Sequence, residues 1–584
     1  MRKKLTEILQ KALGPDVPAE LSVPEESVFG HYSTNVAMRL AKARGKAPLA
    51  LAEELAAEIS ASAPAGFFEK VEAVKPGFIN FWLSKRTIQD ALGDLAAGKH
   101  LSGAGGTGRG ETAGGGSEAG GTAEEKGTVI VEYSDVNIAK VMNLGHFRTT
   151  VIGAALANLL EFAGYRVIRW NYLGDWGTQF GKLIAAYKLW GSEERVKESP
   201  VEELQGLYVR FHNEAKTDRS IEVRGRDEFR KLEDGDPENR RLWEWFKKES
   251  LEEFERTYRI LGVSFDVWIG EAFFEPMLKG VVEELMEEGI AERSEGAIVV
   301  KLDHEQLPPA LIQKSDGASL YLTRDIANLR YRMEQYHPEK IFYVVGGEQS
   351  LHFEQLFAIA PRLKIEAAKL VHVKHGLVLG EGGKKFSTRE GRNVSLASAI
   401  EKAEDLTRRV VEAKNPDLSG SEKEIVIRAV AVGALKYNDL KENRMTDIVF
   451  DWEEMLDFTG DSGPYLQYAY ARLASILRKA NEGGAPAARA DVTLLETEHE
   501  LGLVRKIAEF PDVARRAAGL YATSILAAYL YGLAVAANKF YETTPVLKDE
   551  NAPRRAARLA LARTAAETLR AGLGLLGIET PEKI

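Results

Sequence analysis

Residues 128–172 read TVIVEYSDVNIAKVMNLGHFRTTVIGAALANLLEFAGYRVIRWNY, and this stretch decides the predicted fold class. A run rich in β-branched and aromatic residues opens it, and a polar loop follows. A helical pattern then covers Phe147 to Phe162, and Gly164 is typical of a helix stop. A second β-rich run covers Arg166–Asn171. Strand, helix and strand within about 45 residues predict one parallel crossover unit of an α/β sheet.

The composition is that of a globular protein with several domains. Of 584 residues, 45% are apolar and 28% charged, and roughly 100–200 residues per domain predict about three to five domains. Cysteine is absent, which excludes disulfides, zinc fingers and a cysteine nucleophile. The net charge of −10 argues against a surface that binds nucleic acid everywhere, although a slight basic excess in residues 461–584 permits localised contact. Neither a signal peptide nor a membrane span is evident, so we expect a soluble, cytoplasmic protein with no membrane partner.

The sequence divides into segments of different character. Residues 1–100 have mixed helix and strand patterns, whereas residues 101–127 are rich in Gly, Ala, Thr and Glu and predict a flexible linker. The linker contains the pattern GAGGTG, but low-complexity sequence on both sides argues against a dinucleotide-binding loop. The central segment, 128–395, carries a highly charged helical insertion at about 192–295. Residues 396–459 and 460–584 have helical patterns that predict a helical region and a final bundle.

Further elements follow from local patterns. Strands are predicted at Ala297–Leu302, Leu320–Thr323, Lys340–Val345 and Leu370–His375. Long helices are predicted at Leu242–Leu261, Pro464–Ala480, Leu501–Ala518, Ile525–Phe540 and Ala556–Leu576. The central segment is therefore expected to be an α/β sheet in two halves with a helical insertion between them.

The loop Asn137–His146 has the composition of a phosphate-binding site. It lies between a strand end and a helix start, where open parallel sheets bind ligands. A helix N-terminus presents free N–H groups, and Gly145 would allow close approach of a nucleotide. Lys140 and His146 could donate hydrogen bonds to phosphate oxygens. The alternative is an ordinary polar loop with a helix cap.

The segment GGKKFSTREG, residues 382–391, surrounds three cations with glycines and hydroxyls. A cationic loop flanked by glycine suits the stabilisation of a leaving pyrophosphate. No Gly-Lys pair in the chain is followed by Ser or Thr, so a Walker A loop is excluded. A solvated basic turn is the alternative interpretation.

A third group of residues follows predicted strands and could bind a cationic small molecule. Tyr321 and Asp325 are four apart and would share a face of a helix. Glu348 and Gln349 follow the strand at Lys340–Val345. Carboxylates bind a guanidinium bidentately, although isolated residues of this kind more often form structural ion pairs.

In this order, the three loops resemble the sites of class I aminoacyl-tRNA synthetases. NLGH at 143–146 resembles the HIGH signature, and KFST at 385–388 resembles the KMSKS loop. More narrowly, the chain resembles the arginyl-tRNA synthetase family from about residue 20 to 584, outside the linker. The stretches that carry this resemblance are VEYSDVNIAKVMNLGHFRTTVIG, NYLGDWGTQFG, KSDGASLYLTRDIA, GGEQSLHFEQL, GKKFSTREG, GPYLQYAYARLASIL and LGLLGIETPEKI. The resemblance implies an α/β fold with a Rossmann-like parallel-sheet catalytic domain, a small α+β N-terminal domain and an all-α anticodon-binding bundle.

The resemblance also implies roles for particular residues. The catalytic residues would be Asn143, Gly145, His146, Lys384, Lys385 and Ser387. ATP would contact Val136, Lys140, Met142, Leu144, Gly145, His146, Phe386 and Thr388. Arginine would be held by Glu132, Asn137, Tyr321, Asp325 and Gln349, with Glu271 as a further carboxylate. The tRNA would contact Phe78 and Asn80 at its elbow, and Tyr465, Gln467, Tyr470 and Arg472 near the anticodon, with residues 396–459 on the stem.

The implied activity is that of an arginine–tRNA ligase. ATP with Mg²⁺ would activate L-arginine to arginyl-adenylate, and the 2′-hydroxyl of the terminal adenosine of tRNA(Arg) would accept the arginyl group. No zinc or other protein-bound metal is expected, and the family suggests a monomer. Asn143 stands where the signature usually has His, and Thr388 and Arg389 replace the last Lys-Ser of the generic loop. Two alternatives remain, namely a tRNA-binding relative without catalysis and a small-molecule nucleotidyltransferase.

Overall fold

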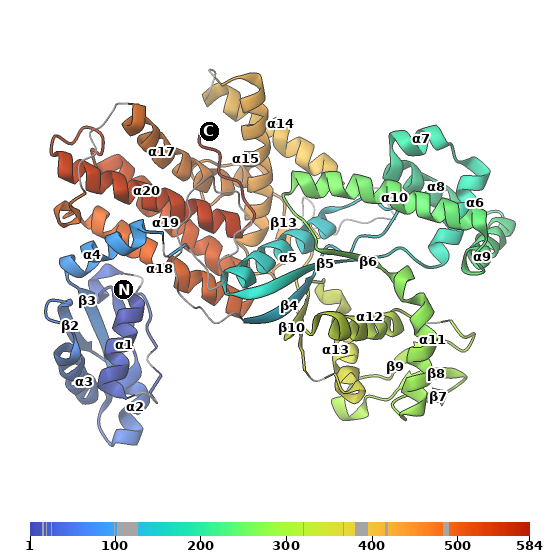
Figure 1. The fold of residues 1–584 in the computed structure, drawn as a ribbon, viewed down its shortest axis with the longest axis horizontal. Coiled ribbons are helices and arrows are strands. Elements are labelled where there is room, and N and C mark those ends of the chain that lie inside the picture. Colours follow the sequence, from blue (N-terminus) through green and yellow to red (C-terminus); the bar gives the residue numbers. More distant parts are fainter. Residues whose placement is uncertain are drawn as a thin grey trace.

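The computed structural model describes most of the chain. Outside the described residues lie 15–16, 19, 25, 99, 102–125, 319, 366, 380–394, 415–417 and 483–489. The predicted linker and the cationic loop therefore fall almost wholly outside the described residues. Figure 1 shows the N-terminal domain below the C-terminal helices and the parallel sheet at the centre, with a first lobe around α6–α10 (residues 178–260) and a second lobe around α11–α13 (residues 271–359) on the other side of the sheet from these domains.

A five-stranded parallel sheet forms the centre of the molecule. Its spatial order is β11-β10-β4-β5-β6. The strands are β4 (Lys126–Glu132), β5 (Tyr165–Leu173), β6 (Val267–Gly270), β10 (Lys340–Tyr343) and β11 (Lys369–His372). Helix α5 (Leu144–Phe162) connects β4 to its parallel neighbour β5, which confirms the predicted crossover unit. Strand β4 begins at Lys126, so the last two residues assigned to the linker are part of the sheet.

Two of the predicted strands differ from the structure. The segment Leu320–Thr323 is not a strand, because helix α12 (Tyr321–Tyr336) begins there. The buried positions Leu322, Ile326 and Leu329 follow a helical period, which outweighs the β propensity of one short run. The strand predicted at Ala297–Leu302 exists as β8, but it lies in a separate antiparallel sheet instead of the central one. This sheet consists of β7 (Glu292–Ser294), β8 (Ala297–Val300) and β9 (Ala310–Gln313).

The charged insertion is helical but shorter than expected. It consists of α6 (Thr178–Trp190), α7 (Glu193–Glu198), α8 (Pro200–Glu214), α9 (Arg219–Glu233) and α10 (Pro237–Ile260). The four residues of β6 that follow pair with β5, so the chain returns to the sheet well before residue 295. A strand of four residues is too short to give a clear alternation of polar and apolar side chains. Helices α11 (Glu271–Glu287), α12 and α13 (Ser350–Ile359) lie with the small antiparallel sheet in the second lobe (Figure 1).

The C-terminal third is a set of packed helices, as expected. Its first part contains α14 (Leu396–Lys414), α15 (Gly420–Leu440) and α16 (Trp452–Met455), with the short parallel pair β12 (Val378–Leu379) and β13 (Ile448–Val449). The last part contains α17 (Gly463–Glu482), α18 (Glu498–Leu520), α19 (Thr523–Thr543) and α20 (Ala552–Leu575). All four late helices predicted from periodicity are present. None of the described helices is both long and apolar enough to span a membrane.

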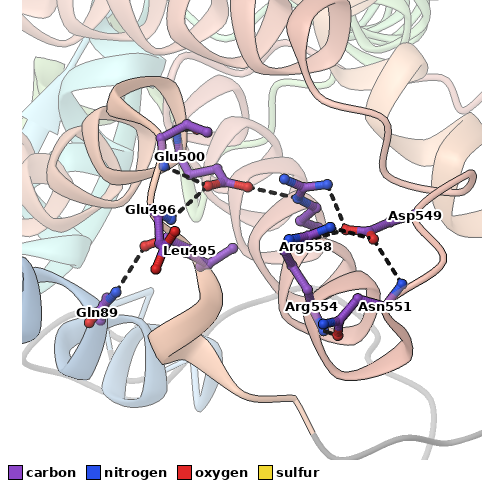
Figure 2. A network of polar contacts seen from close by, with 9 residues as sticks. Gln89, Leu495, Glu496, Glu500, Asp549, Asn551, Arg554 and Arg558 are labelled. Carbon is purple, nitrogen blue, oxygen red and sulfur yellow. Dashed lines mark hydrogen bonds and ion pairs between the residues drawn. The ribbon is translucent and has the colours of Figure 1, made fainter.

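The N-terminal domain packs against the C-terminal helices. It contains α1 (Arg2–Leu13), α2 (Val36–Arg44), α3 (Pro48–Ser62), α4 (Lys85–Ala96) and an antiparallel sheet of β1 (Tyr32–Thr34), β3 (Phe78–Leu83) and β2 (Phe68–Val74). Figure 2 shows the contact, in which Gln89 of α4 donates hydrogen bonds to the carbonyls of Thr493 and Leu495 at 3.0 and 2.9 Å.

A buried charge network supports this contact from inside the C-terminal helices (Figure 2). Glu500 completes the capping box of α18 and accepts a hydrogen bond from Arg558 Nε at 2.7 Å. Arg558 also pairs with Asp549 at 2.7 Å, and Arg554 pairs with the same carboxylate at 2.6 Å. Because these charges are paired and hydrogen-bonded, they fix the start of α18, on which α4 rests.

Candidate active site

The site residues gather at the carboxyl edge of the parallel sheet. Glu132 ends β4, Gly174 follows β5, Gly270 ends β6, and the loop at Gly346 follows β10. The chain runs from β4 to β5 and β6 on one side, and β10 and β11 lie on the other side of β4. The order of strands thus reverses beside β4, and such a switch point is the usual ligand crevice of an open α/β sheet.

The loop after β4 is held in an unusual backbone conformation. Ser134, Asp135 and Ala139 have φ angles of +79°, +48° and +61°, a region that residues with a Cβ rarely adopt. The loop pairs with the end of β5, since Gly174 N–H donates to the carbonyl of Val136 at 3.0 Å. A Cβ at Gly174 would lie 2.3 Å from Asn137 Oδ1, so only glycine fits at this approach.

Asn143 caps helix α5. Its Oδ1 accepts hydrogen bonds from the N–H groups of Gly145 at 2.9 Å and His146 at 3.1 Å. Its own N–H donates to Nδ1 of His146 at 3.1 Å, which completes a capping box. The sequence predicted free N–H groups for phosphate at this helix start, but two of them are already bonded to Asn143. A phosphate here is therefore left mainly with side-chain donors.

His146 is well suited to donate one hydrogen bond. Because Nδ1 accepts from the backbone, the proton of the neutral ring resides on Nε2. Burial, reinforced by the charge of Lys140, lowers the pKa of His146 to about 4. The ring is therefore neutral at physiological pH and offers an Nε2–H. Burial also lowers the pKa of Lys140, the second predicted phosphate ligand.

Changing Asn143 to His is expected to destabilise the protein without raising its activity. His cannot reproduce the short amide cap, and loss of such a cap costs about 1 kcal/mol. We expect a lower unfolding temperature and no gain in the rate of the charging reaction that the family resemblance implies. Thermal unfolding and charging assays on Asn143→His measure both quantities, and the substitution Asn143→Asp, which keeps the cap, is the matched control. A clear gain in rate with His would contradict this role of Asn143.

The two ends of the cationic loop are anchored beside this helix start. On the far side, Leu396 N–H donates to the carbonyl of Met142 at 2.9 Å, and Ser395 forms a bridge with Asn143. On the near side, Arg148 of α5 donates to the carbonyl of Leu377 at 2.8 Å. The predicted residues Lys384, Lys385, Phe386, Ser387 and Thr388 lie outside the described residues. A cleft of about 380 Å³ opens here between Asn143, Ser395 and helix α8.

Acidic side chains converge next to the loop Asn137–His146, the predicted nucleotide loop. Asp325 of α12 accepts a hydrogen bond of 2.5 Å from His352 Nε2 of α13. Burial raises the pKa of Glu271, the first residue of α11, to about 8, opposed by Arg324 and reinforced by Asp325. Burial, with the charges of Asp325 and Glu271, also raises the pKa of Tyr172, whose hydroxyl has no hydrogen-bond partner among the described residues. A guanidinium or another cation placed here would stabilise the charged forms of Asp325 and Glu271 and could donate a hydrogen bond to the Tyr172 hydroxyl.

Glu132 has a partner of its own in the buried core. Its carboxylate forms an ion pair with Arg332 of α12, and the guanidinium of Arg332 lies 4.4 Å from the centre of the Trp170 ring. Glu132 is therefore compensated by Arg332 of the chain itself, whereas Glu271 has no such ion pair among the described residues. The structure brings Glu132, Asp325 and Glu271 into one electrostatic group, because the charge of Asp325 helps to raise the pKa of both other carboxyl groups.

The remaining predicted arginine ligands lie nearer the surface. Tyr321 is 65% exposed, and the Arg324 guanidinium lies 5.9 Å from its ring centre. Gln349 is exposed at the start of α13, and Asn137 is half-buried against Gly174. These side chains border the group of carboxylates instead of lying within it.

Sequence reasoning missed three residues of this site. Tyr172, His352 and Arg332 were assigned no role, although the first two lie within the stretches NYLGDWGTQFG and GGEQSLHFEQL. No local pattern links His352 to Asp325, which lies 27 residues earlier in the chain. Their juxtaposition depends on how α12 and α13 pack over the sheet.

The predicted tRNA contacts are distributed over two regions. Asn80 of β3 is only 3% exposed and accepts a hydrogen bond of 2.7 Å from Ser33, while Phe78 is half-buried at the start of the same strand. In α17, Gln467 is buried and donates to the carbonyls of Ala429 and Glu579. Gln467 thus has an evident structural role.

The other α17 residues lie closer to the surface of the C-terminal helices. Tyr465 packs against Tyr531, and Arg472 lies over the Tyr468 ring and bonds Asn538 at 3.0 Å. Tyr470 is largely buried but borders a cleft of about 390 Å³ between α17 and α20. Arg478, Arg563 and Arg570 also line this cleft, together with three glutamates.

Three family models match the chain and together cover almost all of it. The model for the catalytic domain of class I tRNA synthetases (R) matches residues 115–452. The arginyl tRNA synthetase N-terminal domain matches residues 1–83, and the DALR anticodon binding domain matches residues 466–584.

Complete relatives of known identity are similar to this chain over nearly its whole length. The arginine–tRNA ligase of an Exiguobacterium species is 41% identical over 588 aligned residues, covering 100% of this chain and 99% of the relative. The arginine–tRNA ligase of Streptococcus thermophilus is 43% identical and covers 97% of this chain and 95% of its own. Among solved structures, the arginyl-tRNA synthetase of Plasmodium falciparum aligns with a TM-score of 0.79 at 27% identity, covering 100% of this chain and 99% of its own.

A parallel sheet with a capped NLGH helix at its switch point, joined to a DALR domain, defines a class I aminoacyl-tRNA synthetase. Within that class, the chain belongs to the arginyl-tRNA synthetase family.

Proposed function

We propose that this chain attaches L-arginine to tRNA(Arg) at the carboxyl edge of the sheet. In the first step, an oxygen of the arginine carboxylate attacks the α-phosphorus of ATP, and the bond to pyrophosphate breaks. In the second step, the 2′-hydroxyl of the terminal adenosine attacks the carbonyl carbon, and AMP leaves. Both steps require positioning and charge stabilisation more than covalent chemistry by side chains.

The observation that carries the proposal is the group of carboxyl side chains beside the nucleotide loop, in which Glu271 has no ion pair among the described residues. Glu271, with its raised pKa, and the unpartnered Tyr172 hydroxyl adjoin Asp325. A guanidinium would bring a permanent positive charge and several donors into this group. We infer that Asp325 and Glu271 bind the guanidinium, while Glu132, Asn137 and Gln349 act nearer the amino acid's α-amino end.

ATP binds, in this proposal, between the α5 start and the cationic loop. His146 and Lys140 donate to phosphate oxygens, and Lys384 and Lys385, which lie outside the described residues, supply further positive charge. Mg²⁺ enters as part of the substrate, coordinated by the phosphates. Among the described residues, no three His, Asp or Glu side chains cluster as ligands of a metal ion.

The tRNA would contact the chain through its two end domains. We propose that the N-terminal domain binds the elbow at the strand that carries Phe78 and the buried Asn80, and that α17 and its neighbours bind the anticodon region. The cleft between α17 and α20 offers three arginines and three glutamates, which can donate to and accept from the edges of a base. We also predict that the protein is a monomer and that it acts in the cytoplasm. Sedimentation of the purified protein would check its oligomeric state.

The decisive experiment is a charging assay with each of the twenty amino acids. It uses purified tRNA, ATP and Mg²⁺, and we expect product with arginine alone. Tight tRNA binding without charging would instead support a relative that has lost catalysis. Transfer of AMP to a small molecule without any need for tRNA would support a nucleotidyltransferase.

Arginine binding is expected to release a proton near neutral pH. Burial raises the pKa of Glu271 to about 8, so most of this carboxyl is protonated at pH 7. A bound guanidinium stabilises the carboxylate and lowers that pKa, so the proton leaves. Arginine affinity should therefore rise with pH up to about 8 and then level off.

Calorimetry at pH 7 in two buffers with different ionisation enthalpies measures this release. Wild-type protein should release close to one proton per arginine, and Glu271→Gln should release far less. Equal proton release by both proteins would show that Glu271 does not contact the bound guanidinium.

A further inference from the structure

Helix α10 of the insertion lies along the loops that form the substrate site. Near its start, Trp243 Nε1 donates to the backbone carbonyl of Asp175 at 2.8 Å, and Lys247 Nζ pairs with the Asp175 carboxylate at 2.5 Å. Near its end, the Tyr258 hydroxyl lies 2.6 Å from Ser134 Oγ in the loop after β4. The helix therefore contacts the ends of both β4 and β5.

Between these contacts, Ser250 touches the nucleotide loop itself. This fully buried hydroxyl donates to the carbonyl of Phe246 at 2.7 Å, one turn earlier in α10. Its oxygen accepts from the N–H of Ala139 at 3.2 Å. The first bond uses the only hydroxyl proton, so the roles in the second bond are fixed, with Ala139 as the donor.

Ala139 is the residue of this loop that most needs such a partner. It is buried and has a φ of +61°, a left-handed conformation that is unfavourable for a residue with a Cβ. A buried N–H without an acceptor is also unfavourable. Without Ser250, both the conformation and the hydrogen bond would have to be maintained by the rest of the loop.

A second insertion helix acts on the same loop in the same way. Gln205 of α8 accepts the N–H of Val141 at 2.7 Å. The backbone N–H groups of Ala139 and Val141 thus donate hydrogen bonds to side chains of the insertion and not to the sheet. Lys140 lies between them, and Met142 follows.

We propose that Ser250 is a positioning residue for ATP, which acts by holding the loop around Ala139 and Lys140 in its left-handed conformation. The insertion is thereby part of the adenylation site, although it lies outside the sheet. This inference rests on the proposed function of the loop as the ATP site.

The test uses Ser250→Ala and a compensating change at its target. In arginine charging by the full chain, Ser250→Ala should raise the KM for ATP by roughly tenfold and leave the KM for arginine within about twofold. Glycine adopts positive φ without a steric cost, so Ala139→Gly should bring the KM for ATP of the double variant back towards the wild-type value. A defect in the packing of α10 would not respond to a change in the loop.

Thr257→Ala is the matched control on the same helix. Its hydroxyl also donates to the carbonyl one turn earlier, at Glu253, through a longer bond of 3.4 Å, and we expect its removal to leave the KM for ATP unchanged. If Ser250→Ala folds poorly, Ser250→Cys keeps the volume with a much weaker acceptor, and the same rescue by Ala139→Gly is expected.

Two results would overturn the inference. One is an unchanged KM for ATP in Ser250→Ala and Ser250→Cys, and the other is failure of Ala139→Gly to restore it. In both cases the wild-type protein still charges arginine, so the proposed function would stand. If the wild-type protein charges no amino acid, the proposed function fails before the variants are compared.

Discussion

Replacing Asp325 by asparagine is expected to reduce kcat/KM for arginine by roughly 30-fold to several thousand-fold, with little change in the KM for ATP. Removing one partner of a buried charge pair costs about 2–5 kcal/mol, and each 1.4 kcal/mol is about tenfold. Asparagine has nearly the same shape and can still bond His352, so the change removes mainly the charge. Steady-state charging at varied arginine and varied ATP measures the two constants separately.

The control for this prediction lies on the same helix. Glu334 of α12 is exposed, and Glu334→Gln removes the same charge without touching the pocket. We expect it to leave both constants within about twofold, since isolated surface charges contribute little. If Asp325→Asn has the same kcat/KM for arginine as Glu334→Gln, Asp325 does not bind the guanidinium.

Replacing His146 by asparagine is expected to lower the rate of adenylate formation by about 10²–10³-fold, the usual cost of removing one well-placed donor to a developing anion. The Asn side chain can still accept the N–H of Asn143 through its oxygen, as Nδ1 does now, so the helix cap is preserved. The Nε2–H that we propose as a donor to the phosphate is lost. Single-turnover formation of arginyl-adenylate measures this step.

His146→Gln separates the donor from the cap. Its amide nitrogen reaches about as far as Nε2, so we expect it to recover part of the rate that asparagine loses. Because burial holds the pKa of His146 at about 4, this residue should produce no inflection in the rate between pH 6 and pH 8. Equal rates for His146→Asn and the wild type would exclude the imidazole as a phosphate donor.

The sequence by itself determined the elements and their order. The crossover unit β4–α5–β5 and the four C-terminal helices were predicted closely, since each depends on the periodicity of a contiguous segment. The segments proposed to bind arginine and the nucleotide were also picked out from the sequence, because the short motifs NLGH and SLYLTRDIA carry their residue types locally, and the roles of these residues stay predictions. The failures were segments such as Leu320–Thr323 and β6, whose few residues give too weak a local signal.

Only the tertiary structure decided which of these groups act on one another. Asn143 proved to be a helix cap that occupies two N–H groups, and Glu132 proved to be paired with Arg332, 200 residues away. The contacts of His352 with Asp325 and of Ser250 with Ala139 likewise cross between elements distant in the chain. Hydrogen bonds and burial of this kind depend on how helices pack over a sheet, and no local pattern of side chains encodes that packing.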